Sequence, residues 1–154
     1  MQHVATHASH IGERRMLQIA VAIACLVPIG AGSAGILLGP SFVAAGLPPA
    51  PALDSHFRYL SGLLLAIGLG FLSTMPRIEA HRRRFGLLTG IVVIGGLSRA
   101  ASLFAIGKPP PTMLTALGME LIVTPLLALW QSSYAHRTNT AQRRKQTPRF
   151  TAPP

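Results

Sequence analysis

The sequence predicts an all-α integral membrane protein, a four-helix bundle with its N- and C-termini in the cytoplasm. Three observations support this prediction: four long apolar segments, few charged residues, and basic clusters that alternate with the segments. Charged residues make up 12% of the 154 residues, about half of the roughly 25% usual for soluble domains. Together with a mean hydropathy of +0.44, this composition argues against an ordinary soluble globule.

The four apolar segments lie at about 16–38, 57–76, 85–107 and 112–134, and each holds at most one charged residue. A helix needs roughly 20 apolar residues to cross a bilayer, and all four segments meet that length. They lack the alternation of barrel strands, so helices are the structure that can satisfy the backbone in lipid. The alternative is four buried helices of a soluble protein, for which the chain has too little polar sequence to cover them.

The first segment also resembles a signal peptide. Arg14 and Arg15 precede an apolar run, and Ala31-Gly32-Ser33 resembles a cleavage site. The apolar run continues to Leu38, which is longer than the roughly 7–15 residues of a signal h-region. We therefore interpret this segment as a membrane span.

The connectors between the segments differ in charge. We divide the chain into a disordered cytoplasmic N-terminus (1–14), a four-span membrane domain (15–136) and a basic disordered cytoplasmic tail (137–154). The formal net charge is +10. The basic residues that determine the predicted topology are Arg14, Arg15, Arg77, Arg82, Arg83, Arg84, Arg137, Arg143, Arg144 and Lys145.

By the positive-inside rule, these basic clusters place both termini and the second connector in the cytoplasm, which predicts a multi-pass protein of the inner membrane. The same side chains are expected to contact anionic lipid headgroups, and we favour lipid over nucleic acid as their partner. On the opposite side, the proline-bearing stretch 39–56 is expected to be an extended connector, and Lys108–Pro111 a tight turn that starts the fourth span.

Three ionisable residues, Arg58, Arg99 and Glu120, lie at or within the predicted spans. A charge at the bilayer centre costs roughly 2.5–3.5 kcal/mol on insertion scales, so each should find a partner. At about 1.5 Å per residue, Arg99 lies about 13.5 Å before Lys108, and Glu120 lies about 12 Å after Thr112. The adjacent antiparallel spans therefore bring Arg99 and Glu120 to nearly the same depth, which predicts an ion pair.

These charges allow two interpretations. In the first, they are structural and fix the register of neighbouring helices. In the second, they line a small polar cavity that is open outward and binds an anionic headgroup, a small solute or a proton. The predicted intramembrane polar cluster consists of Asp54, Arg58, Tyr59, Arg99, Ser102 and Glu120, with Asp54 placed four residues before Arg58 to pair with it.

Motifs for catalysis or cofactor binding are missing from the sequence. Its single cysteine, Cys25, excludes an intrachain disulfide and a CxxC redox pair. No predicted span has a histidine in its interior, which disfavours a bis-histidine haem, and no phosphate-binding or nucleophile-elbow motif occurs. We expect no enzymatic activity, no cofactor and no metal site, with a membrane enzyme as the least favoured alternative.

Four short motifs resemble a small bacterial membrane family known as domain of unknown function 4345. They are 54–62 (Asp-Ser-His-Phe-Arg-Tyr-Leu-Ser-Gly), 95–99 (Gly-Gly-Leu-Ser-Arg), 107–109 (Gly-Lys-Pro) and 120–121 (Glu-Leu). The resemblance covers about half of the chain and implies a four-span bundle. It implies no activity, and the basic tail lies outside it.

Taken together, the sequence favours a multi-pass membrane protein with a non-catalytic or accessory role, which associates with itself or with another membrane protein. The alternative is a small carrier or ligand-binding membrane protein that uses Arg58, Arg99 and Glu120. The two hypotheses differ in what Glu120 does: a carrier needs its carboxylate for transport, whereas a structural role needs it for stability.

Overall fold

A computed structural model describes the backbone of residues 2–43 and 50–146 and the side chains of residues 12–43 and 50–140. Within these residues every element is helical, and no strand occurs. The elements are α1 (Gln2–Leu38), η1 (Gly39–Phe42), α2 (Pro51–Leu72), η2 (Met75–Arg77), α3 (Arg82–Ile106), α4 (Pro111–Gly118), η3 (Met119–Val123) and α5 (Thr124–Gln146).

Four stretches of helix are long and apolar enough to cross a membrane: Gly12–Phe42, Pro51–Arg77, Arg82–Ile106 and Pro111–Thr140. The predicted all-α fold with four helices of membrane-spanning length is therefore confirmed. The last stretch combines α4, η3 and α5 into one continuous helix.

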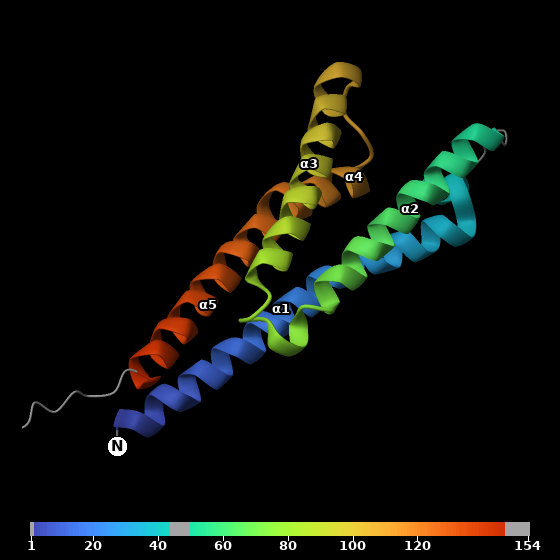
Figure 1. The fold of residues 1–154 in the computed structure, drawn as a ribbon. Coiled ribbons are helices and arrows are strands. Elements are labelled where there is room, and N and C mark those ends of the chain that lie inside the picture. The colour runs from blue at the N-terminus through green and yellow to red at the C-terminus, as the bar shows by residue number, and fades with distance from the viewer. Residues whose placement is uncertain (1, 44–49, 147–154) are drawn as a thin grey trace, which may run out of the picture.

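The helices form two hairpins (Figure 1). α1 packs along α2 over the most extensive interface of the molecule, and α3 packs against η3 and α5. The hairpins meet where α1 contacts α5, near the connector of residues 73–81 that joins α2 to α3. At the other end, hereafter the far end, the two hairpins diverge (Figure 1).

Close approach of α1 and α2 depends on glycines in α1. A Cβ atom at Gly32 would lie 2.7 Å from the backbone nitrogen of Leu65, and one at Gly35 would overlap the side chain of Ser61. Small residues allow helix backbones to approach in this way. The spacing of Gly62 and Ala66 suggests that α2 supplies the small face, but a Cβ at Gly62 would meet nothing within 4 Å. The glycine of α2 that lies in this interface is Gly68, where a Cβ would lie 2.7 Å from Cγ1 of Ile29.

The π-helical turn η3 follows from Pro125. Proline has no backbone N–H, and its ring clashes with the carbonyl four residues earlier. In the π-helical turn η3, a backbone N–H donates to the carbonyl five residues earlier. Both the N–H and the hydroxyl of Thr124 donate to the carbonyl of Met119. The bend expected at Pro125 is thus accommodated as a π turn, and Glu120 lies within it.

The buried core is small and lies at the connector end. It consists of Leu17, Val21, Cys25, Phe71, Ile78, Phe85 and Tyr134. The rings of Phe71 and Phe85 meet edge to face, with centroids 4.8 Å apart, and Ile78 of the connector is fully buried. Within the described part of the chain, this core is where all four long helices are joined.

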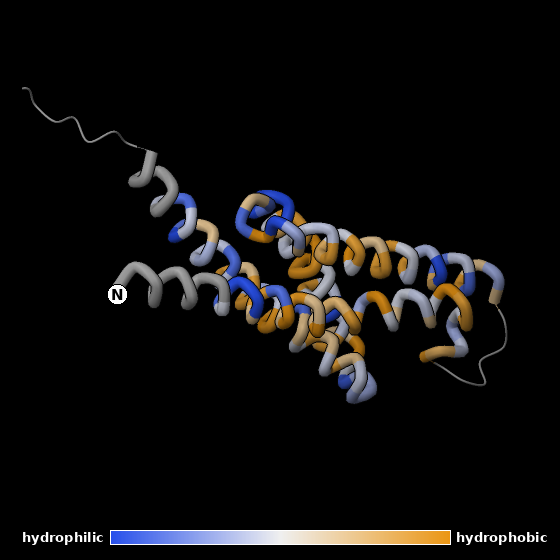
Figure 2. The backbone as a smooth tube through the Cα atoms, turned by 90° about the horizontal axis from the view of Figure 1, so that it is seen from below, coloured by the Kyte–Doolittle hydropathy of each residue, from blue (hydrophilic) through white to orange (hydrophobic). Residues whose placement is uncertain are grey.

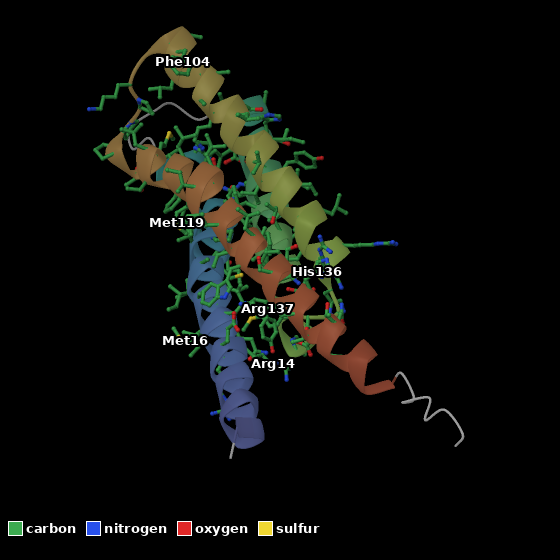
Figure 3. All side chains as sticks on the ribbon, turned by 90° about the vertical axis from the view of Figure 1, so that its left-hand side faces the viewer. Arg14, Met16, Phe104, Met119, His136 and Arg137 are labelled. Carbon is green, nitrogen blue, oxygen red and sulfur yellow. The ribbon has the colours of Figure 1, made fainter. Side chains whose placement is uncertain are left out.

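Most other apolar side chains are exposed, and in a bilayer these would contact lipid. Phe104 and Ile106 are each 87% exposed, and Phe104 lies at the opposite end of the molecule from Arg14 and Arg137 (Figure 3). Apolar residues extend along the long helices, whereas several hydrophilic stretches lie where the helices meet near the connector (Figure 2).

Three helix ends differ from the expected boundaries. Residues 2–14 belong to α1 rather than to a disordered N-terminus, and residues 137–146 belong to α5 rather than to a disordered tail. Extending an existing helix avoids the cost of nucleation, so polar flanks remain helical. α2 begins at Pro51 rather than near residue 57, because proline suits the first helical position. The rest of the predicted tail, residues 147–154, lies outside the described residues.

A glycine pair in α1 tests the close approach of the first hairpin. Gly32→Leu should destabilise the protein by about 1–3 kcal/mol, because the side chain cannot fit against α2. Gly30→Leu is the matched control, since a Cβ there would meet nothing within 4 Å. The measurement is thermal unfolding of both variants in detergent; equal melting temperatures would contradict the assigned interface.

Candidate functional site

The expected ion pair between Arg99 of α3 and Glu120 of η3 is present. Arg99 donates from Nε to one carboxylate oxygen and from Nη2 to the other, each over 3.1 Å. The fork-to-carboxylate geometry is the stronger form of this interaction. The Arg99 side chain is 36% exposed and the Glu120 side chain 17%. Each charge therefore has its counterion within the apolar part of the chain.

Gly96 brings the two helices together at this pair. A Cβ at Gly96 would lie 3.0 Å from the Cβ of Glu120 and 2.7 Å from the side chain of Leu121. A larger residue would push η3 away from α3 and lengthen the Arg99–Glu120 hydrogen bonds. The Gly-Gly-x-x-Arg motif of α3 thus supplies both the close approach and the cation.

Asp54 and Arg58, one turn apart on α2, form the second ion pair. Nε of Arg58 donates to Asp54 over 2.8 Å. Nη1 of Arg58 also donates to the carbonyl of Ile36 and, over 3.4 Å, to that of Leu37. These carbonyls belong to the last turn of α1, which has no further helical donors. Arg58 therefore caps the C-terminus of α1, where a cation is also favoured by the helix dipole.

Gly39 makes room for this cap. Its φ of +62° is in the left-handed region, which glycine enters without steric cost. A Cβ at Gly39 would lie 2.5 Å from Oδ1 of Asp54 and 2.9 Å from Nη2 of Arg58. Glycine is thus required here both by the backbone turn that ends α1 and by the ion pair packed over it.

The predicted polar cluster is divided between the two hairpins. Asp54 and Arg58 belong to the α1–α2 hairpin, and Arg99 and Glu120 to the α3–α5 hairpin. The hairpins diverge at their far ends (Figure 1). The other two members, Tyr59 and Ser102, are exposed. The geometry thus gives two separate ion pairs, each with its own partners.

A third polar cluster, at the connector, was not predicted from the sequence. Three connector carbonyls accept hydrogen bonds from side chains: that of Met75 from Gln18, that of Pro76 from Arg14, and that of Ile78 from Gln131, over 2.7, 2.7 and 2.6 Å. The donors come from α1 and α5. We call these three hydrogen bonds the connector clasp.

Two glutamates, Glu13 and Glu79, form ion pairs beside the clasp. Nε of Arg14 lies 3.5 Å from Oε2 of Glu79. Glu13 pairs with Arg137 and accepts a hydrogen bond from the indole of Trp130 over 3.3 Å. Arg14 and Arg137 lie at this end of the molecule on neighbouring helices (Figure 3). Glu79 of the connector therefore contacts α1, and Glu13 of α1 contacts α5.

The remaining predicted topology residues differ in their surroundings. Arg15, Arg77, Arg82, Arg83 and Arg84 are exposed. Arg143, Arg144 and Lys145 lie outside the described side chains.

Glutamine in a predicted span was the one sequence signal for the clasp. A polar amide in a lipid-facing position is costly, so Gln18 and Gln131 needed partners. Their partners could not be identified because backbone carbonyls carry no sequence signature. Among the residues with described side chains, no group of three metal-ligating residues occurs.

The Arg99–Glu120 pair predicts a double-mutant result. Glu120→Ala should lower the amount of protein in the membrane, because it leaves Arg99 as an unpaired charge, at a cost of up to about 2.5–3.5 kcal/mol. Adding Arg99→Ala should partly restore accumulation. Quantitative immunoblotting of membranes measures both, and a double variant no more abundant than the worse single variant would contradict the pairing.

The connector clasp predicts a second result. Gln131→Leu leaves the buried carbonyl of Ile78 without a donor and should cost about 1–3 kcal/mol. Trypsin should then cleave faster after Arg77, the arginine of the connector. Ser133→Leu, at an exposed position of the same helix, is the control, and equal cleavage rates in the two variants would exclude a role for Gln131 in holding the connector.

Comparison with known proteins gives one family. The family model described as Domain of unknown function (DUF4345) matches residues 16–131, about three quarters of the chain. No curated protein matches, and no solved structure matches. The matched residues run from the start of the first apolar segment to Gln131 and include both ion pairs. With its four membrane-length helices, the chain is a multi-pass membrane protein, and it belongs to the domain of unknown function 4345 family.

Proposed function

We propose that this protein is a non-catalytic accessory protein of the inner membrane, with both termini in the cytoplasm. The observation that carries the proposal is that the charged side chains of the apolar segments already have hydrogen-bond partners within the chain. Arg99 and Glu120 satisfy each other with two hydrogen bonds, and Arg58 is engaged by Asp54 and by the end of α1. Charges used in this way stabilise the helices and are not free to take part in chemistry.

The form of the molecule supports an accessory role. Among the residues with described side chains, the core shared by the two hairpins lies at the connector end, and exposed apolar side chains extend over the rest of the helices. Helices in lipid associate through van der Waals contact. We infer that another membrane protein or a second copy of this chain packs on these helices.

The orientation rests on charge. The connector carries Arg77 and is followed at once by Arg82, Arg83 and Arg84, whereas the described parts of the far-end connectors carry only Lys108. The positive-inside rule retains the arginine-rich side in the cytoplasm.

A carrier is the second candidate, favoured by the π-helical turn at Glu120. Such turns are frequent at functional sites, and a charged residue inside a membrane is by default a candidate for transport. In this reading, opening of the Arg99–Glu120 pair would expose both charges to a solute or a proton.

Topology reporters and one conservative variant test the proposal. A fluorescent protein fused after Phe150 should fluoresce, and a periplasmic phosphatase fused there should be inactive; the reverse result would overturn the orientation. Native mass spectrometry of protein released from membranes should find a bound protein partner or a second copy, since the accessory role requires one.

Glu120→Gln should lower stability without abolishing uptake of any solute; a folded Glu120→Gln variant that loses uptake would establish the carrier instead.

A further inference from the structure

We propose that the start of α3 holds a binding site for the phosphate group of an anionic phospholipid. A hollow of about 690 Å³ lies there, lined by Glu79, Ala80, His81, Arg82, Arg83, Arg84, Gly86 and Asn139. The connector and the first turns of α3 supply all of these residues except Asn139, which comes from α5. This inference rests on the membrane location within the proposed function and adds a specific ligand to it.

The charge of the hollow favours an anion. Its lining holds three arginines and one carboxylate, that of Glu79, and Glu79 already has Arg14 of α1 as its counterion. Among the described residues, no ion pair involves Arg82, Arg83 or Arg84. The planar guanidinium groups of arginine match the geometry of phosphate oxygens.

The backbone adds to the same preference. α3 starts at Arg82, its first turn contains no acidic residue, and no side chain caps it. The first N–H groups of a helix have no intrahelical acceptors, and the helix dipole there is positive. Three cations at this end of α3 are unfavourable beside the positive end of the helix dipole. A bound anion would offset both the charge of the arginines and the dipole. The amide side chain of Asn139 is a further hydrogen-bonding group of the lining.

The surface beside the hollow indicates that the phosphate belongs to a lipid. Gly86 borders the hollow, and Gly90, Ile94 and Leu97 continue along the same face of α3 at helical spacing. Ile94 is 66% exposed and Leu97 57%. This apolar stripe leads from the hollow into the membrane-spanning part of α3. A phosphate held in the hollow would therefore have acyl chains lying along the stripe.

Two glycines of α3 provide a test that leaves the charge of the protein unchanged. A Cβ at Gly86 or at Gly95 would meet nothing within 4 Å, so each position accepts a large side chain. Gly86→Phe would fill the hollow. Gly95→Phe adds the same side chain nine residues later, on the opposite side of the helix, and is the matched control. Asn139→Leu removes the amide contributed by α5 and serves if Gly86→Phe fails to fold.

The full chain, purified in detergent, is given equal amounts of phosphatidylglycerol and phosphatidylcholine, and the lipid retained is read by native mass spectrometry. We expect the wild type and Gly95→Phe to prefer phosphatidylglycerol by about tenfold, and Gly86→Phe and Asn139→Leu to lose most of that preference. Equal retention of both lipids by the wild type, or an unchanged preference in Gly86→Phe, would overturn the proposal.

An arm with inorganic phosphate distinguishes the two sources of the anion. Added phosphate should leave the amount of retained phosphatidylglycerol unchanged, since contact of the acyl chains with the apolar stripe contributes to binding. Displacement of phosphatidylglycerol by phosphate would show that the hollow takes soluble phosphate, and would overturn the assignment to lipid. Lipid retention by purified protein does not depend on where the termini lie or on Glu120. Failure here therefore leaves the accessory role intact, and failure of that role leaves this site intact.

Discussion

Backbone carbonyls that are shielded from water must find hydrogen-bond donors, and the connector between α2 and α3 is where this requirement is met by other helices. The segment 73–81 joins the end of α2 to the start of α3 and folds against interior turns of α1 and α5, and its residue Ile78 is fully buried. Side chains of α1 and α5 supply the donors, so the connector bonds to both neighbouring helices. The small core gathers around the same segment. Beyond the clasp and this core, the two hairpins are joined by Glu13 of α1, which pairs with Arg137 and accepts a hydrogen bond from Trp130 of α5.

The same requirement accounts for the charges farther along the helices. Arg58 neutralises Asp54 and also satisfies carbonyls at the end of α1, and Arg99 matches Glu120 with two hydrogen bonds. In a low-dielectric surrounding an unpartnered polar group is costly. Each of these side chains thus serves the local structure first. The arginines at the start of α3 are different, because they line an open hollow and no described acidic side chain pairs with them.

The ion pairs were predictable because helix geometry is regular. A fixed rise per residue places Arg99 and Glu120 at one depth, and a spacing of four residues places Asp54 beside Arg58. The glycine faces were not predictable in the same way. Spacing marks Gly62, Ala66 and Gly70 of α2 as a small face, but the close approach of α1 and α2 uses Gly32 and Gly35 of α1 and Gly68 of α2. Small residues recur on several faces of a membrane helix, and only packing decides which face turns inward.

The sequence by itself determined the number of membrane-length helices and the matching levels of Arg99 and Glu120, because these follow from local composition and a constant helical rise. Only the tertiary structure decided that the helices pair as two hairpins, that the ion pairs lie on different hairpins, and that Gln18 and Gln131 hold the connector. These features depend on the rotation of each helix about its axis and on backbone carbonyls as acceptors. Neither the rotation of a helix nor the use of a backbone carbonyl can be predicted from the order of side chains along the sequence.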